Sequence, residues 1–261
     1  MTALTQFIAN QPVSRQAAMP GESAQDSIVA ITGLRFGWHG SENRVLDIET
    51  LQINRGERVF IEGPSGSGKS TLLSLMAGVV TPQQGCVTIL DQRIDNLSGA
   101  QRDRFRADHI GFIFQLFNLI SYLSVLENVT LPCRFSKQRQ AKAQKRSANP
   151  EAEAQRLLIQ LDMAAPDLLQ RPVSDLSVGQ QQRVAAARAL IGSPEILIAD
   201  EPTSSLDTHH REGFIHLLFE ECRREDITLV FVSHDTRLAA LFDRTIRLEE
   251  INRAREMKIE D

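Results

Sequence analysis

A glycine-rich segment near residue 65 constrains the fold of this chain more than any other feature. Apolar residues before it predict a buried strand over 58–62, and the residues after it predict a helix over 70–77 that ends at Gly78. The segment matches G-x-x-x-x-G-K-[ST], a pattern that binds nucleotide phosphates, through Gly63, Pro64, Ser65, Gly66, Ser67, Gly68, Lys69 and Ser70, with Thr71 next. Strand, loop and helix in this order predict a nucleotide site.

The residue types in this segment suit phosphate binding. Glycines let the backbone approach the phosphates with its N–H groups pointing inward, and the helix N-terminus adds partial positive charge. Lys69 is expected to reach the β- and γ-phosphates, and the Ser70 hydroxyl is expected to ligate Mg²⁺. The alternative is a glycine-rich turn that matches by chance, and the flanking strand and helix argue against it.

Length and composition narrow the class of protein. The chain has 261 residues, enough for one large domain with a core, and its formal net charge of −4 gives no global bias toward nucleic acid. It contains no run of 18 or more apolar residues, and residues 1–26 lack the pattern of a signal peptide. We therefore expect a cytoplasmic chain that does not span a membrane by itself.

The cysteines and one histidine pair are weak candidates for metal binding. Cys86, Cys133 and Cys222 are odd in number and far apart, which favours reduced structural thiols over a disulfide framework or a zinc site. His209 and His210 are neighbours, and neighbouring side chains on a helix point in different directions. A solvated position is therefore the favoured interpretation for this pair.

Further motifs follow the glycine-rich segment in a fixed order. They are Gln115 in Gly-Phe-Ile-Phe-Gln, the Leu-Ser-Val-Gly-Gln segment 176–180, the pair Asp200-Glu201 after an apolar run, Ser-Ser-Leu-Asp at 204–207, and His234 in Val-Ser-His-Asp. With these motifs, the chain resembles the ATP-binding subunit of an ABC transporter from about Ile28 to Leu248. Six motifs in the family's order are far more specific than any one of them.

The resemblance implies an α/β fold: a P-loop NTPase of ABC type, with a mostly parallel core sheet, an antiparallel β-subdomain and a helical subdomain. The sequence pattern agrees with it. Segments 28–38 and 45–53 read as β-strands, and the continuous apolar runs 196–199 and 227–232 are typical of parallel strands buried on both faces. One helix is predicted to have Asn149 as its N-cap and Pro150 in its first turn, and to bury Leu157, Leu158 and Leu161.

These patterns divide the chain into three parts. We expect a mobile N-terminal extension over residues 1–26, the ABC ATP-binding domain over 27–250 with its helical subdomain at about 116–188, and a polar C-terminal tail over 251–261. No internal repeat is visible, so a single ATPase unit is expected.

The resemblance assigns catalytic and nucleotide-binding roles to single residues. Asp200 would hold Mg²⁺ through water, Glu201 would polarise the attacking water, His234 would contact the γ-phosphate, and Gln115 would join the Mg²⁺ and water shell. The pair Asp200-Glu201 follows a buried strand, and ligands bind at that edge of an open α/β sheet. The alternatives are a solvated turn for the acidic pair and a structural role for a lone histidine.

Trp38 aligns with the aromatic residue that stacks on adenine in the family. The alternative is a core tryptophan packed beside Phe36.

The segment 176–180 implies that one copy of the chain is not enough. In the family, the helix that begins at this segment caps the γ-phosphate bound to the opposite subunit, here through Ser177, Gly179 and Gln180. Two chains would therefore pair head to tail around two ATP molecules, with Asp207 in the loop that crosses the interface. Val178 stands where the family usually has glycine, while the serine, the second glycine and the glutamine are present.

The variant signature, segment 111–115 and segment 124–129 look like the subfamily of lipoprotein-release and macrolide-efflux ATPases. This resemblance implies an integral membrane permease as partner, a second copy of the chain, and a position on the inner face of the membrane. The rival class is a soluble ABC ATPase that acts on nucleic acid or ribosomes. Such proteins usually carry tandem units or long coiled-coil insertions, which this chain lacks, so no direct nucleic acid partner is expected.

Segment 134–150 departs from the family's usual length. It carries six basic residues and no acidic one: Arg134, Lys137, Arg139, Lys142, Lys145 and Arg146. A positive loop in the helical subdomain could approach anionic lipid headgroups. The alternative is a solvated insertion before the Asn149 cap.

Overall fold

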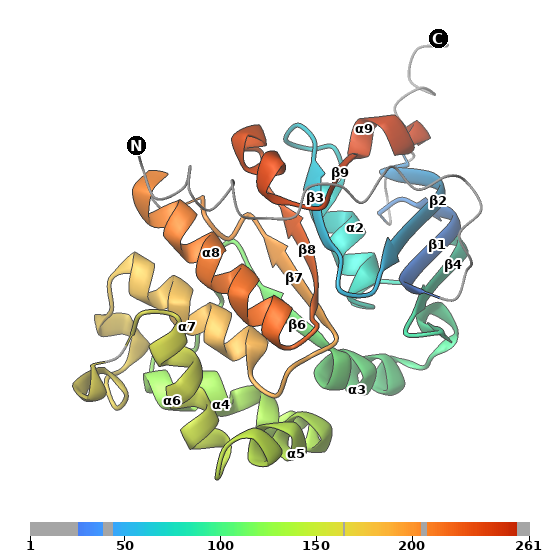
Figure 1. Cartoon of the computed structure of the whole chain (residues 1–261). Helices are drawn as coiled ribbons and strands as arrows, with labels where there is room; N and C mark the ends of the chain where they lie inside the picture. Colours follow the sequence, from blue (N-terminus) through green and yellow to red (C-terminus); the bar gives the residue numbers. More distant parts are fainter. Residues whose placement is uncertain (1–25, 39–43, 164, 205–207, 255–261) are drawn as a thin grey trace.

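The computed structural model describes residues 26–38, 44–163, 165–204 and 208–254 (Figure 1). The predicted N-terminal extension up to residue 25, the predicted interface residue Asp207 and the side chains of His209 and His210 lie outside what it describes.

Two sheets organise the chain. The first has four strands in the order β2-β1-β4-β5, in which β1 pairs antiparallel with both β2 and β4. Its strands are β1 (Ser27–Phe36), β2 (Leu46–Asn54), β4 (Gln84–Ile89) and β5 (Gln92–Arg93). The predicted antiparallel segments are therefore confirmed.

The second sheet has five strands in the order β6-β7-β8-β3-β9, and every pair in it is parallel. Its strands are β6 (Ile110–Ile113), β7 (Ile196–Asp200), β8 (Thr228–Val232), β3 (Arg58–Glu62) and β9 (Arg244–Arg247). All five residues of β8 are buried, as expected for a strand covered on both faces.

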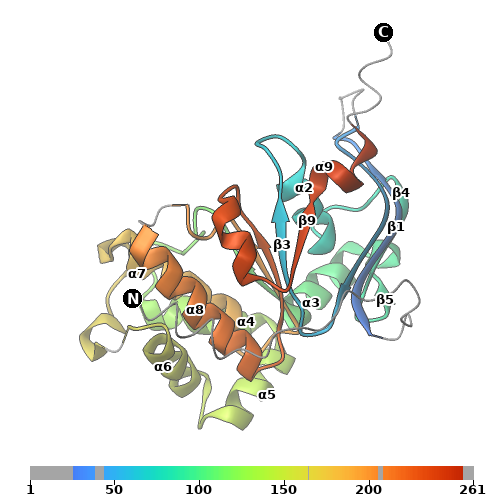
Figure 2. The ribbon, with the colours of Figure 1, turned by 45° about the horizontal axis from the view of Figure 1, so that its top comes forward.

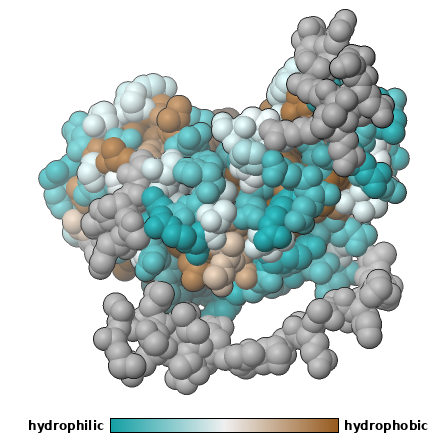
Figure 3. All heavy atoms as spheres, turned by 90° about the horizontal axis from the view of Figure 1, so that it is seen from above, coloured by the Kyte–Doolittle hydropathy of each residue, from teal (hydrophilic) through white to brown (hydrophobic). Residues whose placement is uncertain are grey.

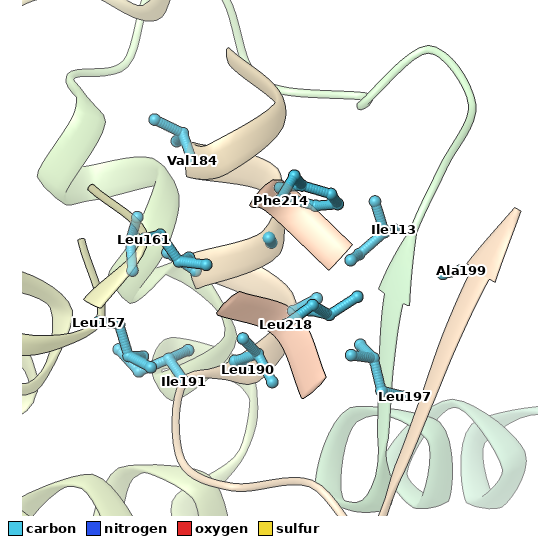
Figure 4. Close-up of a cluster of buried hydrophobic side chains, with 14 of the residues drawn as sticks. Ile113, Leu157, Leu161, Val184, Leu190, Ile191, Leu197, Ala199, Phe214 and Leu218 are labelled. Atoms are coloured by element: carbon cyan, nitrogen blue, oxygen red, sulfur yellow. The ribbon is translucent and has the colours of Figure 1, made fainter. Parts of the chain in front are cut away.

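The two faces of the parallel sheet belong to separate hydrophobic clusters. Leu229 and Phe231 of β8 join one cluster, whereas Val230 and Val232 join the other, because successive side chains of a strand point to opposite faces. Figure 4 shows part of the first cluster, where Leu197 of β7 faces residues of the covering helices such as Phe214 and Leu218.

Helices cover both faces (Figures 1 and 2). The face shared with the antiparallel sheet carries α2 (Lys69–Met76) and α3 (Gly99–His109). The other face carries α4 (Val125–Phe135), α5 (Lys137–Arg146), α6 (Pro150–Gln160), α7 (Val178–Leu190) and α8 (Thr208–Arg224). Short helical turns lie at Ile94–Asn96, Pro166–Leu168, Val173–Asp175 and Thr236–Leu241, and α9 spans Leu248–Ile251. Within the described ranges, no helix is both long and apolar enough to cross a membrane.

Local sequence signals place the start of α6. The Asn149 side chain accepts a hydrogen bond from the Ala152 N–H at 2.7 Å, and Pro150 is the first residue of the helix. Leu157, Leu158 and Leu161 are buried in the first cluster, so the predicted cap and core residues are confirmed.

The basic segment forms a helix rather than the predicted loop, and one of its cations is buried. Arg139 of α5 is 3% exposed and donates from Nε to the Ile191 carbonyl at 2.7 Å and from Nη2 to the Ala189 carbonyl at 2.6 Å. The last carbonyls of α7 have no partner within their own helix, and Arg139 supplies the missing donors. Burial lowers the pKa of Arg139 to about 10.

Two more cations of α5 form ion pairs. Lys142 Nζ lies 2.8 Å from Glu195 Oε1, and Arg146 pairs with Glu153 and Glu225. Of the basic residues in this segment, Arg134, Lys137, Lys145 and Arg146 are exposed. Any contact of this segment with anionic headgroups therefore depends on these four.

The cysteines carry free thiols. Cys133 and Cys222 are buried in the first cluster, and burial raises their pKa values to about 11 and about 12. Buried neutral thiols of this kind act as small apolar side chains.

Candidate nucleotide-binding site

The glycine-rich loop lies between β3 and α2, at the top of the molecule in Figure 1. Gly66 and Gly68 have φ angles of 76° and 102°, a region that glycine adopts without strain. A Cβ at Gly68 would lie 2.8 Å from Leu46 Cδ2, so the loop packs tightly against the start of β2. Glycine is therefore required at position 68 for two independent reasons.

The N-terminus of α2 is prepared for an anion. Helices α3, α4 and α7 begin with capping boxes, whereas at the start of α2 the described residues supply neither a side-chain cap nor an acidic first turn. Free N–H groups at a helix start attract phosphate. Lys69 Nζ donates to the carbonyls of Gly63 and Pro64 at 2.7 and 3.0 Å, which holds its charge over the loop.

A cavity of about 470 Å³ opens beside the loop. Figure 3 views this side of the molecule from above, and hydrophilic residues cover most of it, with hydrophobic ones in separate patches. The cavity is lined by residues from five segments, namely Val45, Ser65, Gly66, Gly68, Lys69, Ser70, Thr71, Gln115, Asp200, Glu201 and His234. The fold therefore brings residues that are up to 189 positions apart into one polar site.

Asp200 ends β7 at the carboxyl edge of the parallel sheet. Burial raises the pKa of its carboxyl group, and the negative charge of Glu201 raises it further. A hydrogen bond from Ser70 and the positive charge of Lys69 lower this pKa. The balance leaves the pKa raised, so the ionised form lacks full compensation in this site. A cation placed between Ser70 and Asp200 would supply it. Hydroxyl, carboxylate and amide oxygens are also the donors that Mg²⁺ prefers.

Glu201 and His234 meet across the ends of two neighbouring strands. Glu201 has a φ angle of 47°, and its N–H donates to the Val232 carbonyl at 2.9 Å, which turns the residue off the end of β7. Its Oε2 lies 2.7 Å from His234 Nδ1. A carboxylate held by a histidine beside the phosphate loop is suited to accept a proton from water.

The signature residues lie apart from this cavity. Ser177 Oγ accepts a hydrogen bond from the Gln180 N–H at 3.3 Å, and Gln180 Oε1 accepts one from the Ser177 N–H at 2.9 Å. This capping box starts α7, which packs on the face of the sheet opposite α2. Of the described residues predicted for the site, Ser177, Gly179 and Gln180 do not line the cavity, and neither do Gly63, Pro64, Ser67 and Trp38.

Trp38 lies near the edge of the described region, before residues 39–43. Its ring stands edge-on to Phe36, with centroids 5.1 Å apart and an interplanar angle of 87°. The side chain contacts Phe36 as the core alternative required, but Trp38 is 49% exposed, which contradicts a core position. Its stacking on adenine stays a prediction.

Two contributors escaped the sequence analysis. Val45 lines the cavity, and a valine at the start of a strand gives no signal of that position. Arg188 of α7 donates to the carbonyls of Phe117 and Asn118 at 2.5 and 2.7 Å, and both of these residues have positive φ angles, 60° and 49°. Arg188 thereby ties α7, whose N-cap is Ser177, to the strained turn that follows Gln115.

Comparison with known proteins agrees with this site. Residues 46–204 match the ABC transporter family. YbbA of Escherichia coli (strain K12), an uncharacterized ABC transporter ATP-binding protein, is 42% identical over 232 residues, which cover 88% of this chain and 96% of YbbA. The lipoprotein-releasing system ATP-binding protein LolD of Syntrophotalea carbinolica is 39% identical over 226 residues, covering 86% of this chain and 96% of LolD.

A solved structure shares the fold. The ATP-binding cassette MJ0796, determined as a dimer in a post-hydrolysis state with ADP and Pi, matches with a TM-score of 0.74 at 36% identity, over 84% of this chain and 93% of that one. This match confirms the predicted ABC-type fold with its parallel, antiparallel and helical parts. The chain therefore belongs to the ABC transporter family, as an ATP-binding subunit that hydrolyses ATP.

Proposed function

We propose that this chain hydrolyses Mg²⁺-bound ATP as one half of a head-to-tail homodimer that drives an integral membrane permease. One observation carries the proposal: the cavity gathers Lys69, Ser70, Asp200 and Glu201, while the capped start of α7 lies outside it. A site that lacks the signature residues of its own chain needs those of another chain.

The cavity suggests roles for its charged and polar side chains. Lys69 would bind the β- and γ-phosphates, and Ser70, Asp200 and Gln115 would hold Mg²⁺, which neutralises phosphate charge when bound. Glu201 would orient the attacking water and accept its proton, because its carboxylate is already fixed by His234 at 2.7 Å. His234 would keep its second ring nitrogen free for the γ-phosphate.

The start of α7 is suited to a second nucleotide. Val178 is 50% exposed there, and the Ser177 side chain is also exposed. The capping box uses the N–H groups of Ser177 and Gln180, and those of Val178 and Gly179 lie outside it. N–H groups at a helix start favour an anion, here the γ-phosphate bound to the other copy. The dimeric structure of MJ0796 supports a dimer of this chain.

Exposed apolar residues support a membrane subunit as the partner. Leu116 and Tyr122, between β6 and α4, are 83% and 81% exposed, and Phe135 at the end of α4 is 72% exposed. All three lie within residues 116–135, and large exposed apolar side chains are a common mark of binding surfaces. With LolD among its relatives, we propose export or lipoprotein transport and a position on the inner face of the membrane, held there by the permease.

A complementation assay tests the shared site. Glu201→Gln should bind ATP, hydrolyse almost none and accumulate as a dimer in size-exclusion chromatography. Lys69→Ala and Ser177→Arg should each be nearly inactive alone. Mixed together they form one intact site, made of Lys69 from one copy and Ser177 from the other, so the mixture should recover part of the wild-type rate.

Ser174→Arg is the matched control, because Ser174 is exposed three residues before Ser177 and outside the capping box. It should hydrolyse ATP at the wild-type rate. Wild-type hydrolysis by Ser177→Arg alone, or by Glu201→Gln, would contradict the proposal. Copurification of a four-helix membrane protein with a large periplasmic domain would support the permease, whereas stimulation by nucleic acid or ribosomes would favour the rival class.

A further inference from the structure

The chain returns to the phosphate loop after its last strand. Figures 1 and 2 show α9 beside β9 and β2, near the loop between β3 and α2. The boundary placed at residue 251 by the sequence analysis falls inside this helix. Asn252, the next residue, is 6% exposed, and Ala254 is 7% exposed, so the residues that begin the expected polar tail are packed into the molecule.

The Asn252 side chain is fully hydrogen-bonded. Its Oδ1 accepts from the N–H groups of Asp47 and Ala254 at 2.8 and 3.2 Å. Its Nδ2 donates to the carbonyls of Val45 and Ser67 at 3.0 and 3.4 Å. The oxygen faces only donors and the nitrogen faces only acceptors, so the orientation of the amide is determined by its surroundings.

The carbonyls of Val45 and Ser67 belong to two segments that pack closely against each other. Ser67 is in the phosphate loop, and Val45 lines the nucleotide cavity just before β2. A Cβ placed on the adjacent Gly68 would be 3.3 Å from the Val45 carbonyl oxygen, which shows how near the loop lies to this strand. Asn252 therefore joins the loop to the wall of the cavity through a single buried amide.

The same C-terminal segment also contacts the beginning of the loop. Leu248 is fully buried, and its Cβ would lie 3.5 Å from a Cβ placed on Gly63. Arg247 Nε lies 2.6 Å from Oε1 of Glu62, the last residue of β3. Residues 247–252 thus contact both ends of the phosphate loop.

We propose that Asn252 is a positioning residue for nucleotide binding, which holds the phosphate loop and Val45 in the arrangement that receives the phosphates. A loop that is ordered before binding loses less conformational freedom when the nucleotide binds, so affinity rises. The inference rests on nucleotide binding by a single chain. It does not depend on the proposed dimer or on the permease.

Asn252→Asp isolates the donor half of the amide. The variant keeps an oxygen for the N–H groups of Asp47 and Ala254, but turns a carboxylate oxygen toward the carbonyls of Val45 and Ser67. Asn252→Ala removes both halves without adding charge. Arg253→Gln is the matched control, because Arg253 is the adjacent residue, pairs with Glu49 at 2.6 Å, and has a side chain that is 63% exposed.

The readouts are the Kd of ADP by calorimetry, the Tm of the free chain, and kcat and KM for ATP. With the hydrogen bonds to the carbonyls of Val45 and Ser67 lost, we expect Asn252→Asp to raise the Kd of ADP and the KM of ATP about tenfold, and to change kcat less than about twofold. Asn252→Ala should raise both constants by a smaller factor, and Arg253→Gln should leave them unchanged.

ADP binding separates this inference from the proposed function, because it requires neither hydrolysis nor a dimer. The proposal is overturned if the Asn252 variants bind ADP as tightly as Arg253→Gln while their Tm falls, since that result describes a purely structural residue. If Asn252→Asp does not fold, the Kd of Asn252→Ala decides: a value equal to that of Arg253→Gln overturns the proposal, and a raised value supports it.

Discussion

Single residues of the site acquire their roles from partners on distant segments. Glu201 and His234 are 33 positions apart, yet their side chains form one hydrogen-bonded pair. The pair exists because β7 and β8 are neighbours and parallel, so both strands end at the same edge of the sheet. The positive φ angle of Glu201 then turns the residue off the strand end, beside the phosphate loop. Backbone strain at such a position is typical of functional sites.

Trp38 provides a test at the residue scale. If its exposed ring stacks on adenine, ATP should change Trp38 fluorescence, and Trp38→Ala should raise the Kd of ATP by about 2- to 12-fold, the equivalent of about 0.5–1.5 kcal/mol of stacking. Trp38→Phe keeps an aromatic face and should retain most of the affinity. An emission spectrum that saturating ATP leaves unchanged, together with wild-type affinity in Trp38→Ala, would show that the ring does not contact the nucleotide.

At the scale of elements, α5 shows how a basic segment becomes part of the core. Arg139 binds the C-terminal carbonyls of α7, while Lys142 and Arg146 pair with carboxylates on neighbouring segments. Glycine helps to make the contact possible, because a Cβ at Gly192 would lie 2.5 Å from the Arg139 carbonyl oxygen. The helix therefore acts as a cap on the end of α7.

Arg139→Met tests this capping role. The variant keeps the length of the side chain but leaves the carbonyls of Ala189 and Ile191 without their donors, and we expect the free energy of unfolding to fall by about 2–4 kcal/mol. Lys145→Met on the same helix removes an exposed charge and should change it by less than about 0.5 kcal/mol. Urea denaturation measures the free energy of unfolding of both variants. Equal stability of the two variants would mean that the buried hydrogen bonds contribute nothing net.

At the scale of the whole molecule, charged side chains connect the helical part to the parallel sheet. Arg156 of α6 binds Glu153 on its own helix and Glu221 of α8, with nitrogen–oxygen distances of 2.7 and 2.6 Å. The carboxylate of Glu195, just before β7, lies 2.8 Å from Lys142 Nζ of α5 and 3.0 Å from His109 Nδ1 of α3. These contacts hold the helical part through polar groups in addition to the shared apolar cluster.

Glu195 makes the stability of this connection depend on pH. Burial alone would raise its pKa, but hydrogen bonds from His109 and Lys142 and their charges outweigh it and hold the pKa at about 2. Because the folded pKa lies below the unfolded one, the added stability is present above about pH 4.5 and is lost as the pH falls toward 2. Glu195→Gln should cost about 2 kcal/mol above pH 5, after allowance for partial exposure, and progressively less below pH 4.5.

Urea denaturation of wild type and Glu195→Gln at several pH values between 3 and 7 measures this difference. Asp167→Asn is the control, since Asp167 forms an exposed pair with Arg171 and should give a small effect at every pH. A difference between Glu195→Gln and wild type that stays constant over the whole range would exclude the assigned role of the Glu195 carboxylate.

The sequence by itself determined the features of this protein that depend on neighbouring residues. The glycine loop between a buried strand and a helix, the Asn149 cap and the doubly buried strands β7 and β8 all depend on residues close together in the chain. Capping, turn formation and strand periodicity are short-range effects, so a local pattern carries enough information to predict them. The order of the motifs then identified the family, which the comparisons confirm.

Only the tertiary structure decided which side chains meet. The direction of Arg139 depends on the unpaired carbonyls at the end of α7, 50 or more positions later, and the burial of Asn252 depends on Val45 and Ser67, at least 185 positions earlier. In the sequence both look like ordinary polar residues of a basic stretch and a C-terminal tail. A hydrogen bond forms wherever the fold brings a donor to a buried acceptor, and that distance is set by the sheet order and helix packing, which no local pattern records.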